Sequence, residues 1–341
     1  MKILVYGAGA IGLYIGGSLG AAGQEVTFLA RPSAAEAIRA RGVRVRSRRG
    51  EKIAREVLAV TSLVEALAAG PHDCLVFALK SYATATAIEE LRAVTGCPPP
   101  ILCLQNGVGN EAELARAFGP EWVIAGTVTT AVSKPDEGEV VVERERGVGV
   151  ALGHPLSARI VEALQSAGLN ARSYPAPAPM KWSKLLINLI GNATSAILDM
   201  TVAELFADRR AFAIELAMLR ECLAVMRALK YPIVDLPKTP VRALAFGLRL
   251  PPLVARPLLA RAVALGRGRK MPSFHIDLHA GRGQTEVRWL NGAVARHGAE
   301  VGVRAPANRI LMDTLEALSE GRANKEDFRR KPEALWQLIN T

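Results

Sequence analysis

Three polar side chains recur at steps of four within the apolar stretch 180–197 (MKWSKLLINLIGNATSAI): Lys184, Asn188 and Asn192. In a single helix, this spacing places one ammonium group and two carboxamides in one stripe. An ammonium group can protonate or stabilise a developing oxyanion, and carboxamides can hold a polar ligand without adding charge. The alternative is a lysine buried in a structural ion pair. In both cases the stripe needs partners, because unpaired polar groups are costly in a core.

The composition indicates a globular chain that is long enough for two domains. Of the 341 residues, 50% are hydrophobic and 22% are charged, a mixture typical of folded proteins. The net charge of +11 favours an anionic partner. Nucleic acid is not expected, because only 5% of the residues are aromatic and no zinc-finger or RNA-binding signature occurs. A phosphorylated cofactor and a small carboxylate ligand would use the same positive potential.

The cysteines and histidines predict neither disulfides nor a metal site. The four cysteines form no CxxC pair, which is typical of a reducing cytosol. His275, His279 and His297 lack convincing metal-ligand spacing and are interpreted as surface or packed residues. Residues 3–24 carry no charge, but their glycines suit a strand, turn and helix better than a secretory signal. The run 185–198 is too short and too polar to span a membrane, so we expect a cytoplasmic protein.

A strand–loop–helix pattern opens the chain. Lys2–Tyr6 predicts an apolar strand, a helix follows to about Ala22, and Glu25–Ala30 predicts a second strand. Glycines in this context allow a tight turn, the approach of a pyrophosphate and close packing of helix on strand. The pattern therefore predicts a dinucleotide-binding domain, and its loop consists of Gly7, Ala8, Gly9, Ala10, Ile11 and Gly12.

Arg31 indicates which dinucleotide binds. An NAD site places an acidic residue at the end of the second strand, where it holds the ribose 2′-hydroxyl. This chain has Leu29-Ala30-Arg31 instead, and a guanidinium group suits the 2′-phosphate of NADP. The alternative is an ordinary surface arginine. We expect NADP(H) as the cofactor.

Polar residues also follow two buried strands of the first half. Cys74–Leu79 precedes Lys80, and Ile101–Leu104 precedes Gln105-Asn106. Because ligands bind beyond the carboxyl ends of parallel strands, Lys80 and Asn106 are predicted to contact the cofactor. Val132, shortly after a third strand at 122–130, is assigned to the same set.

Prolines mark the predicted domain boundary. Residues 140–142 and 148–152 are expected to form a hairpin, and the segment 173–179 (SYPAPAP) predicts a stiff, non-helical connector. The fold class is therefore α/β. A Rossmann-type, doubly wound sheet in residues 1–173 is followed by an all-α domain in residues 174–341.

The second domain shows two helix-capping signals and a basic segment. Thr201–Glu204 predicts a capping box, and Thr285 is expected to cap a helix with Glu286 in its first turn. Residues 236–270 carry no acidic residue, and their basic residues alternate with leucine and valine. Prolines are expected to divide this segment into short helices. Packing against the protein or against a second copy, as in a homodimer, is favoured over a membrane surface.

Taken together, the motifs resemble those of the ketopantoate reductase family (2-dehydropantoate 2-reductase) over nearly the whole chain. They occur in the family's order: GAGAIG, Arg31, LKSY, QNG, KWSKLLIN, SFHIDL and TEVRWLNG. The resemblance implies a Rossmann domain followed by a helical domain. It also implies NADPH-dependent reduction of a small 2-oxo acid, ketopantoate, to the 2-hydroxy acid pantoate, in the biosynthesis of pantothenate and coenzyme A.

The resemblance also implies roles for matching residues. Lys184 matches the general acid, and Glu286 matches an acid that contacts the hydroxyl and ribose region; these are the two catalytic residues. Ser273 matches the residue near the substrate carboxylate. The implied substrate-binding residues are Asn106, Lys184, Asn188, Asn192 and Ser273, and the cofactor contacts include Lys80, Asn106 and Glu286.

One departure from the family leaves the substrate open. Some members carry an asparagine before a Gly-Glu-Leu triplet, whereas this chain has Val202-Ala203-Glu204-Leu205. The polar contact with the far hydroxyl of ketopantoate is then absent, so a more apolar 2-oxo acid is the alternative substrate. A non-catalytic NADP-binding regulator is the alternative of another class. The presence of both Lys184 and Glu286 argues against it.

Overall fold

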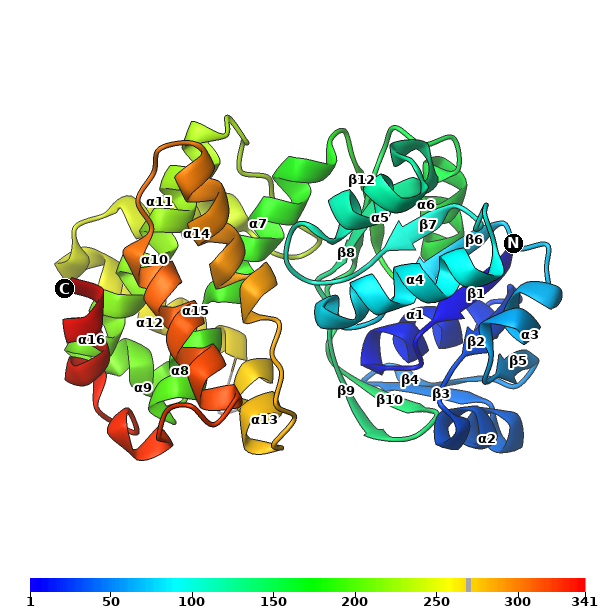
Figure 1. The fold of residues 1–341 in the computed structure, drawn as a ribbon, viewed down its shortest axis with the longest axis horizontal. Helices are drawn as coiled ribbons and strands as arrows, with labels where there is room; N and C mark the ends of the chain where they lie inside the picture. Colours follow the sequence, from blue (N-terminus) through cyan, green and yellow to red (C-terminus); the bar gives the residue numbers. More distant parts are fainter. Residues whose placement is uncertain (268–270, 341) are drawn as a thin grey trace. The chain divides into compact units, whose positions relative to one another are not determined.

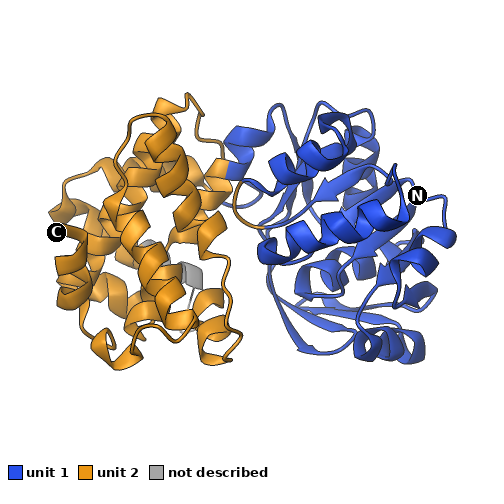
Figure 2. Ribbon diagram, viewed as in Figure 1, with its two compact units in different colours: residues 1–105, 109–181, 236–239 blue, residues 106–108, 182–235, 240–341 orange. Residues whose placement is uncertain are grey.

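The computed structural model describes residues 1–267 and 271–340, and their contacts divide the chain into two compact units (Figures 1 and 2). Unit 1 comprises residues 1–105, 109–181 and 236–239. Unit 2 comprises residues 106–108, 182–235 and the described part of 240–341. The expected boundary after residue 173 lies within a strand, β12 (Ala171–Tyr174), and the residues that follow it up to Lys181 belong to unit 1.

The larger sheet of unit 1 is the predicted Rossmann-type sheet. Its strand order is β12-β11-β8-β7-β6-β1-β2-β5, and β5, β2, β1, β6, β7 and β8 run parallel. The direction of winding reverses between β1 and β6, which makes the loops after these strands a ligand-binding edge. The strands are β1 (Lys2–Tyr6), β2 (Glu25–Leu29), β5 (Val57–Val60), β6 (Cys74–Phe77), β7 (Ile101–Cys103), β8 (Val123–Val128), β11 (Val148–Ala151) and β12.

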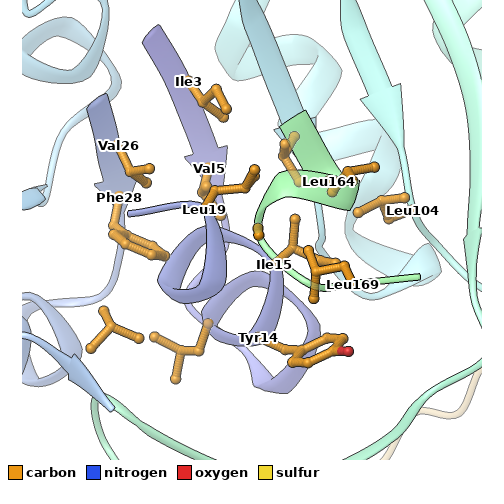
Figure 3. Close-up of a cluster of buried hydrophobic side chains, with 14 of the residues drawn as sticks. Ile3, Val5, Tyr14, Ile15, Leu19, Val26, Phe28, Leu104, Leu164 and Leu169 are labelled. Atoms are coloured by element: carbon orange, nitrogen blue, oxygen red, sulfur yellow. The ribbon is translucent and has the colours of Figure 1, made fainter. Parts of the chain in front are cut away.

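Helices cover both faces of this sheet, because both faces of its strands are apolar. Ile3 and Val5 of β1 point toward Ile15 and Leu19 of the first helix, as Figure 3 shows, whereas Leu4 packs in a second cluster on the opposite face. The helices of unit 1 are α1 (Ala10–Ala21), α2 (Pro32–Arg41), α3 (Leu63–Ala68), α4 (Thr84–Val94), α5 (Asn110–Phe118) and α6 (Ser157–Ser166), with short 3₁₀ turns η1 (Ser81–Ala83) and η2 (Pro120–Trp122).

The predicted hairpin between residues 140–142 and 148–152 is wrong. Residues 140–142 lie in β10 (Glu139–Arg144), which pairs with β9 (Ala131–Asp136) and β3 (Val43–Ser47) in a smaller sheet with β4 (Gly50–Ala54). Residues 148–151 form β11, which pairs with β8 and β12 in the larger sheet. Both segments have the apolar alternation of strands, but burial under α1 decides the partner of β10, and a local pattern does not show this.

Unit 2 is helical, as predicted. Its longest helix, α10 (Arg209–Ala228), packs against α9, α11, α14, α15 and α16. The remaining elements are α7 (Pro177–Leu189), whose first residues belong to unit 1, α8 (Asn192–Leu198), α9 (Val202–Ala207), α11 (Val241–Arg249), α12 (Pro252–Arg267), α13 (Ser273–His279), η3 (Val287–Trp289), α14 (Asn291–Glu300), α15 (Pro306–Ser319), η4 (Lys325–Asp327) and α16 (Pro332–Asn340).

Two predictions about prolines and helices are corrected. The connector 173–179 is not wholly non-helical, because α7 begins at Pro177. Proline fits a first helical turn, where its missing N–H would have no intrahelical partner. Pro257 lies inside α12 without ending it, and Pro251 separates α11 from α12. The capping box at Thr201 is confirmed.

The basic segment 236–270 belongs to unit 2 from residue 240 onward and is buried over part of its length. Val241, Leu248 and Leu259 are buried, whereas Phe246 and Leu253 are exposed. The side chain of Arg267, and residues Arg269 and Lys270 as a whole, lie outside the described part of the chain. Among the described residues, no helix is long and apolar enough to cross a membrane.

Candidate active site

The glycine loop after β1 is anchored to both neighbouring strands. Gly7 has φ +106°, and its N–H donates to the carbonyl oxygen of Leu29 at 3.1 Å. A Cβ at Gly7 would lie 2.8 Å from Cδ2 of Leu79, which follows β6. Only glycine fits this turn, because it combines a positive φ with close packing.

Gly9 and Gly12 shape the start of α1 for a phosphate group. Gly9 precedes the helix without a side-chain cap, and a Cβ there would meet nothing within 4 Å. A Cβ at Gly12 would lie 1.9 Å from the Gly7 carbonyl oxygen, so the helix can approach the loop this closely only with glycine. No acidic side chain lies in the first turn of α1. The open, uncapped helix N-terminus therefore fits a dinucleotide pyrophosphate.

The other predicted cofactor contacts of unit 1 lie at strand ends or strand starts. Arg31 is exposed and immediately precedes α2, two residues after β2 ends. Lys80 follows β6 and precedes η1. Val132 lies near the start of β9, where it pairs with Val142. Arg31 and Lys80 thus share the carboxyl edge of the larger sheet with the glycine loop, and Val132 lies on the smaller sheet.

Lys184 and Asn188 lie one turn apart on α7, as the spacing predicts. The Nδ2 group of Asn188 donates to Oδ1 of Asn106 at 3.1 Å. Asn106 comes from the loop after β7, and its segment 106–108 belongs to unit 2. Two of the predicted substrate-binding amides are therefore in direct contact, although they are far apart in the sequence.

The stripe continues onto a second helix, which corrects the prediction of one helix over 180–197. Gly191 has φ +63° and separates α7 from α8, so Asn192 begins α8. The N–H of Gly191 donates to Oε2 of the fully buried Glu215 at 2.8 Å. A Cβ at Gly191 would lie 2.7 Å from Cγ2 of Val202. The contact with Val202 and the hydrogen bond to Glu215 thus stabilise the break between α7 and α8, which sets the position of Asn192.

Asn192 joins α8 to the start of α13. Its Oδ1 atom accepts a hydrogen bond from Oγ of Ser273 at 3.4 Å and from the backbone N–H of Phe274 at 3.2 Å. The side chain of Asn192 is 7% exposed. Because the side-chain oxygen of Asn192 already accepts hydrogen bonds from α13, its Nδ2 group is the part that would donate to a ligand.

The loop that carries Asn106 also packs against the turn that carries Glu286. Gly107 has φ +78°, and a Cβ there would lie 2.4 Å from the carbonyl oxygen of Trp289. The Val108 N–H donates to that same oxygen at 3.1 Å, and the Trp289 N–H donates to the Glu286 carbonyl oxygen at 3.0 Å. These bonds tie the two segments together within unit 2.

The expected Thr285 cap is wrong. Glu286 itself precedes the short 3₁₀ turn η3, and the next helix, α14, begins at Asn291. Hydrogen bonds to the 106–108 segment shape this turn, and a local capping signal does not reveal them. Glu286 is nonetheless buried, at 4% exposure.

A second lysine of the KWSK motif has a structural role that sequence reasoning did not assign. Lys181 is buried and forms an ion pair with Oε1 of Glu111 at 2.7 Å. Its Nζ atom also donates to the carbonyl oxygens of Gln105 at 2.7 Å and Gly126 at 3.3 Å. Lys181 thus forms a buried structural ion pair of the kind that was the alternative for Lys184. Both lysines are surrounded by apolar residues, so the sequence does not distinguish them.

Comparisons with known proteins match both units. A family model described as ketopantoate reductase PanE/ApbA matches residues 3–153, and its C-terminal counterpart matches residues 178–319. A 2-dehydropantoate 2-reductase from Pyrococcus horikoshii is 27% identical over 324 residues, covering 93% of this chain and 97% of the relative. One from Halobacterium salinarum is 29% identical over 324 residues, covering 92% and 97%.

Solved structures share the fold. A PanE/ApbA family ketopantoate reductase from Ralstonia eutropha JMP134 has a TM-score of 0.79 and 27% identity, covering 94% of this chain and 99% of that one. D-mandelate dehydrogenase, solved with NADH and anilino(oxo)acetate, has a TM-score of 0.77 at 22% identity and covers 94% and 99%. The family models, together with relatives matched over more than nine-tenths of the chain, show that this protein belongs to the ketopantoate reductase family of oxidoreductases.

Proposed function

We propose that the protein reduces ketopantoate (2-dehydropantoate) to pantoate with NADPH as the hydride donor and Lys184 as the proton donor. One observation carries this proposal. Unit 2 brings the predicted substrate-binding residues into contact from separate parts of the chain, through the Asn188–Asn106 and Ser273–Asn192 hydrogen bonds. The named relatives of this chain catalyse the same reaction, which supports the substrate and a place in pantothenate biosynthesis.

Lys184 supplies the proton in this proposal. When NADPH is bound, it supplies a hydride to the C2 carbonyl carbon of the 2-oxo acid. The electron pair of the C=O bond moves onto oxygen, and the Nζ group of Lys184 stabilises that oxygen and then gives it a proton. The product is a 2-hydroxy acid, and the neutral amine of Lys184 regains its proton from solvent.

The polar side chains around Lys184 hold the substrate. Asn188 and Asn192 bind polar groups of the 2-oxo acid without adding charge. Ser273 donates to its carboxylate once its single hydroxyl proton turns away from Oδ1 of Asn192. Asn106 contacts both the substrate and the cofactor. Glu286 accepts a hydrogen bond from the hydroxyl that forms, or from the cofactor ribose.

The cofactor proposed for unit 1 is NADPH. The open helix N-terminus at Gly9 supports pyrophosphate binding, and Arg31 at the end of β2 supports recognition of the 2′-phosphate. Lys80 and Val132 complete the proposed contacts.

The Arg31→Ala variant tests this assignment. Loss of one charge-assisted contact should raise the KM for NADPH by about 10- to 100-fold and leave the KM for NADH nearly unchanged. The matched control is Arg41→Ala, at the other end of α2. An unchanged preference for NADPH in Arg31→Ala would remove Arg31 from the site.

A more apolar 2-oxo acid is the second candidate substrate. Val202 is 1% exposed and lies against Gly191, directly before Asn192. An apolar side chain therefore packs against the residue before Asn192, at the position where some members of the family carry an asparagine that holds the far hydroxyl of ketopantoate.

Steady-state oxidation of NADPH across a panel of 2-oxo acids tests the function. The panel includes ketopantoate, its analogue without the hydroxyl group, and a phenyl-substituted 2-oxo acid. The highest kcat/KM on ketopantoate supports the proposal, and the highest value on an apolar acid supports the second candidate. No turnover on any member would favour a non-catalytic NADP-binding regulator.

A further inference from the structure

Two histidines and an aspartate from distant parts of the chain meet within unit 2. His275 and His279 lie one turn apart on α13, and Asp199 directly follows α8. Oδ1 of Asp199 is 2.8 Å from Nε2 of His275 and 3.9 Å from Nε2 of His279. The two imidazole rings stack with their centroids 4.0 Å apart. The sequence-based interpretation that these histidines lack ligand spacing is incomplete, because Asp199 lies 76 residues before His275.

The spacing of these three atoms suits one transition-metal ion. All three ligand atoms lie within 4.8 Å of one another. Ligands about 2.0–2.1 Å from a tetrahedral zinc ion are about 3.3 Å apart. The two distances from Asp199 lie on either side of this value. The stacked imidazole rings must tilt apart before both nitrogens can point at one ion. Two imidazoles and one carboxylate form a common donor set for zinc and related ions.

A neighbouring arginine orients the carboxylate of the proposed site. Nε of Arg329 donates to Oδ2 of Asp199 at 3.1 Å, which holds the carboxylate and leaves Oδ1 facing the histidines. Hydrogen-bonded partners of this kind commonly orient metal-ligating carboxylates.

His279 is the most exposed of the three side chains. The nearby charges of Lys325 and Arg329 oppose a bound cation, so moderate affinity is expected. The side chains of His279 and Asp199 are 41% and 28% exposed, which allows the ion to enter and water to fill a fourth position.

We propose that Asp199, His275 and His279 form a binding site for a divalent transition-metal ion such as zinc. The ion would cross-link the end of α8 to α13. Because α8 begins with Asn192 and α13 begins with Ser273, the cross-link would stabilise the pair of elements whose contact is already made by those two residues. The site is structural in this proposal, and it does not depend on the proposed reductase activity.

Isothermal titration of the untagged, chelator-treated full-length chain with zinc tests the site. We expect saturable binding of one ion per chain. His279→Gln and Asp199→Asn should each weaken binding by at least about 10-fold, because each removes a ligand. The matched control is His297→Gln, which removes an imidazole paired with Glu300 at 2.7 Å but leaves the proposed ligands intact. Absence of saturable binding, or equal binding by His279→Gln, would overturn the proposal.

Thermal unfolding gives a second measurement that is independent of activity. Zinc at about 100 times its dissociation constant should raise the Tm of the native chain and of His297→Gln by about 5 °C. The His279→Gln variant should show at most about half of this rise, because at 10-fold weaker binding the same zinc concentration is only about 10 times its dissociation constant. An equal rise in all three proteins would place the bound zinc elsewhere and contradict the assignment.

Discussion

At the scale of single residues, the KWSK motif contains two lysines, for which we propose different roles. Lys181 is committed to a buried ion pair with Glu111 and to two backbone carbonyl groups. Lys184 shares the stripe with Asn188, which contacts Asn106. The Lys184–Asn188 part of the stripe could be predicted, because it follows from helical spacing alone, whereas the place of Asn192 on a second helix could not. The structural partner of Lys181 could not, because Glu111 comes from a different helix, α5.

Replacing Lys181 should reduce stability. The Lys181→Met variant leaves the Glu111 carboxylate without its partner in a largely buried position, which costs about 3–5 kcal/mol in the free energy of unfolding. Urea denaturation measures this loss. Adding Glu111→Gln should restore a substantial part of it, because the unpaired charge is then removed. A double variant that is no more stable than Lys181→Met would contradict the ion-pair explanation.

At the scale of elements, strands with a consistent apolar pattern could be predicted from the sequence. Breaks between helices that depend on distant residues could not. The β1–loop–α1 unit matches its prediction closely, since its signals are local. The break at Gly191 depends on Val202 and on the buried Glu215, which approach from α9 and α10. The pairing of β10 likewise depends on burial under α1.

The Gly191→Ala variant tests the break between α7 and α8. Alanine at φ +63° costs about 1–2 kcal/mol, and its Cβ would also press on Val202. The matched control is Gly302→Ala, where φ is +71° but a Cβ meets nothing within 4 Å. Urea denaturation should show a larger loss for Gly191→Ala. Adding Val202→Ala should reduce the penalty of the Gly191 change, and no reduction would contradict the contact.

The capping box of α9 predicts a pH dependence of stability. Hydrogen bonds from Thr201, first from its backbone and then from its hydroxyl group, and one from Arg330 hold the pKa of Glu204 below its ordinary value. The stabilisation is therefore present above the unfolded pKa of about 4.5 and is lost as the pH falls through the folded value.

Unfolding by urea at pH 7 and at acidic pH measures this effect. Glu204→Gln should be less stable than the native chain at pH 7, and the difference should shrink as the pH falls. The stability of Thr201→Ala should depend on pH with the same sign but more weakly than that of the native chain, because alanine removes the hydroxyl bond and keeps the backbone N–H and Arg330. A difference that is constant with pH would contradict the role of Glu204.

At the scale of the whole molecule, the chain crosses between its two units more often than a single boundary implies. Residues 106–108 leave unit 1 to join unit 2, and residues 236–239 return to unit 1. Proline spacing predicts a connector but not these exchanges, because they depend on contacts between distant segments. The first of these crossings, at residues 106–108, allows Asn106 to accept a hydrogen bond from Asn188. The fold class is confirmed, and a homodimer and a cytoplasmic location stay proposals.

The central claim is that Lys184 is the proton donor of an NADPH-dependent 2-oxo acid reductase. The most direct test is kcat for NADPH oxidation on ketopantoate in the Lys184→Ala variant, together with NADPH affinity from a fluorescence titration. The matched control is Lys331→Ala, an exposed lysine of unit 2. Loss of a general acid should lower kcat about 10²- to 10⁴-fold, leave NADPH affinity nearly unchanged and leave the control fully active. A Lys184→Ala variant that keeps the native kcat would contradict the account.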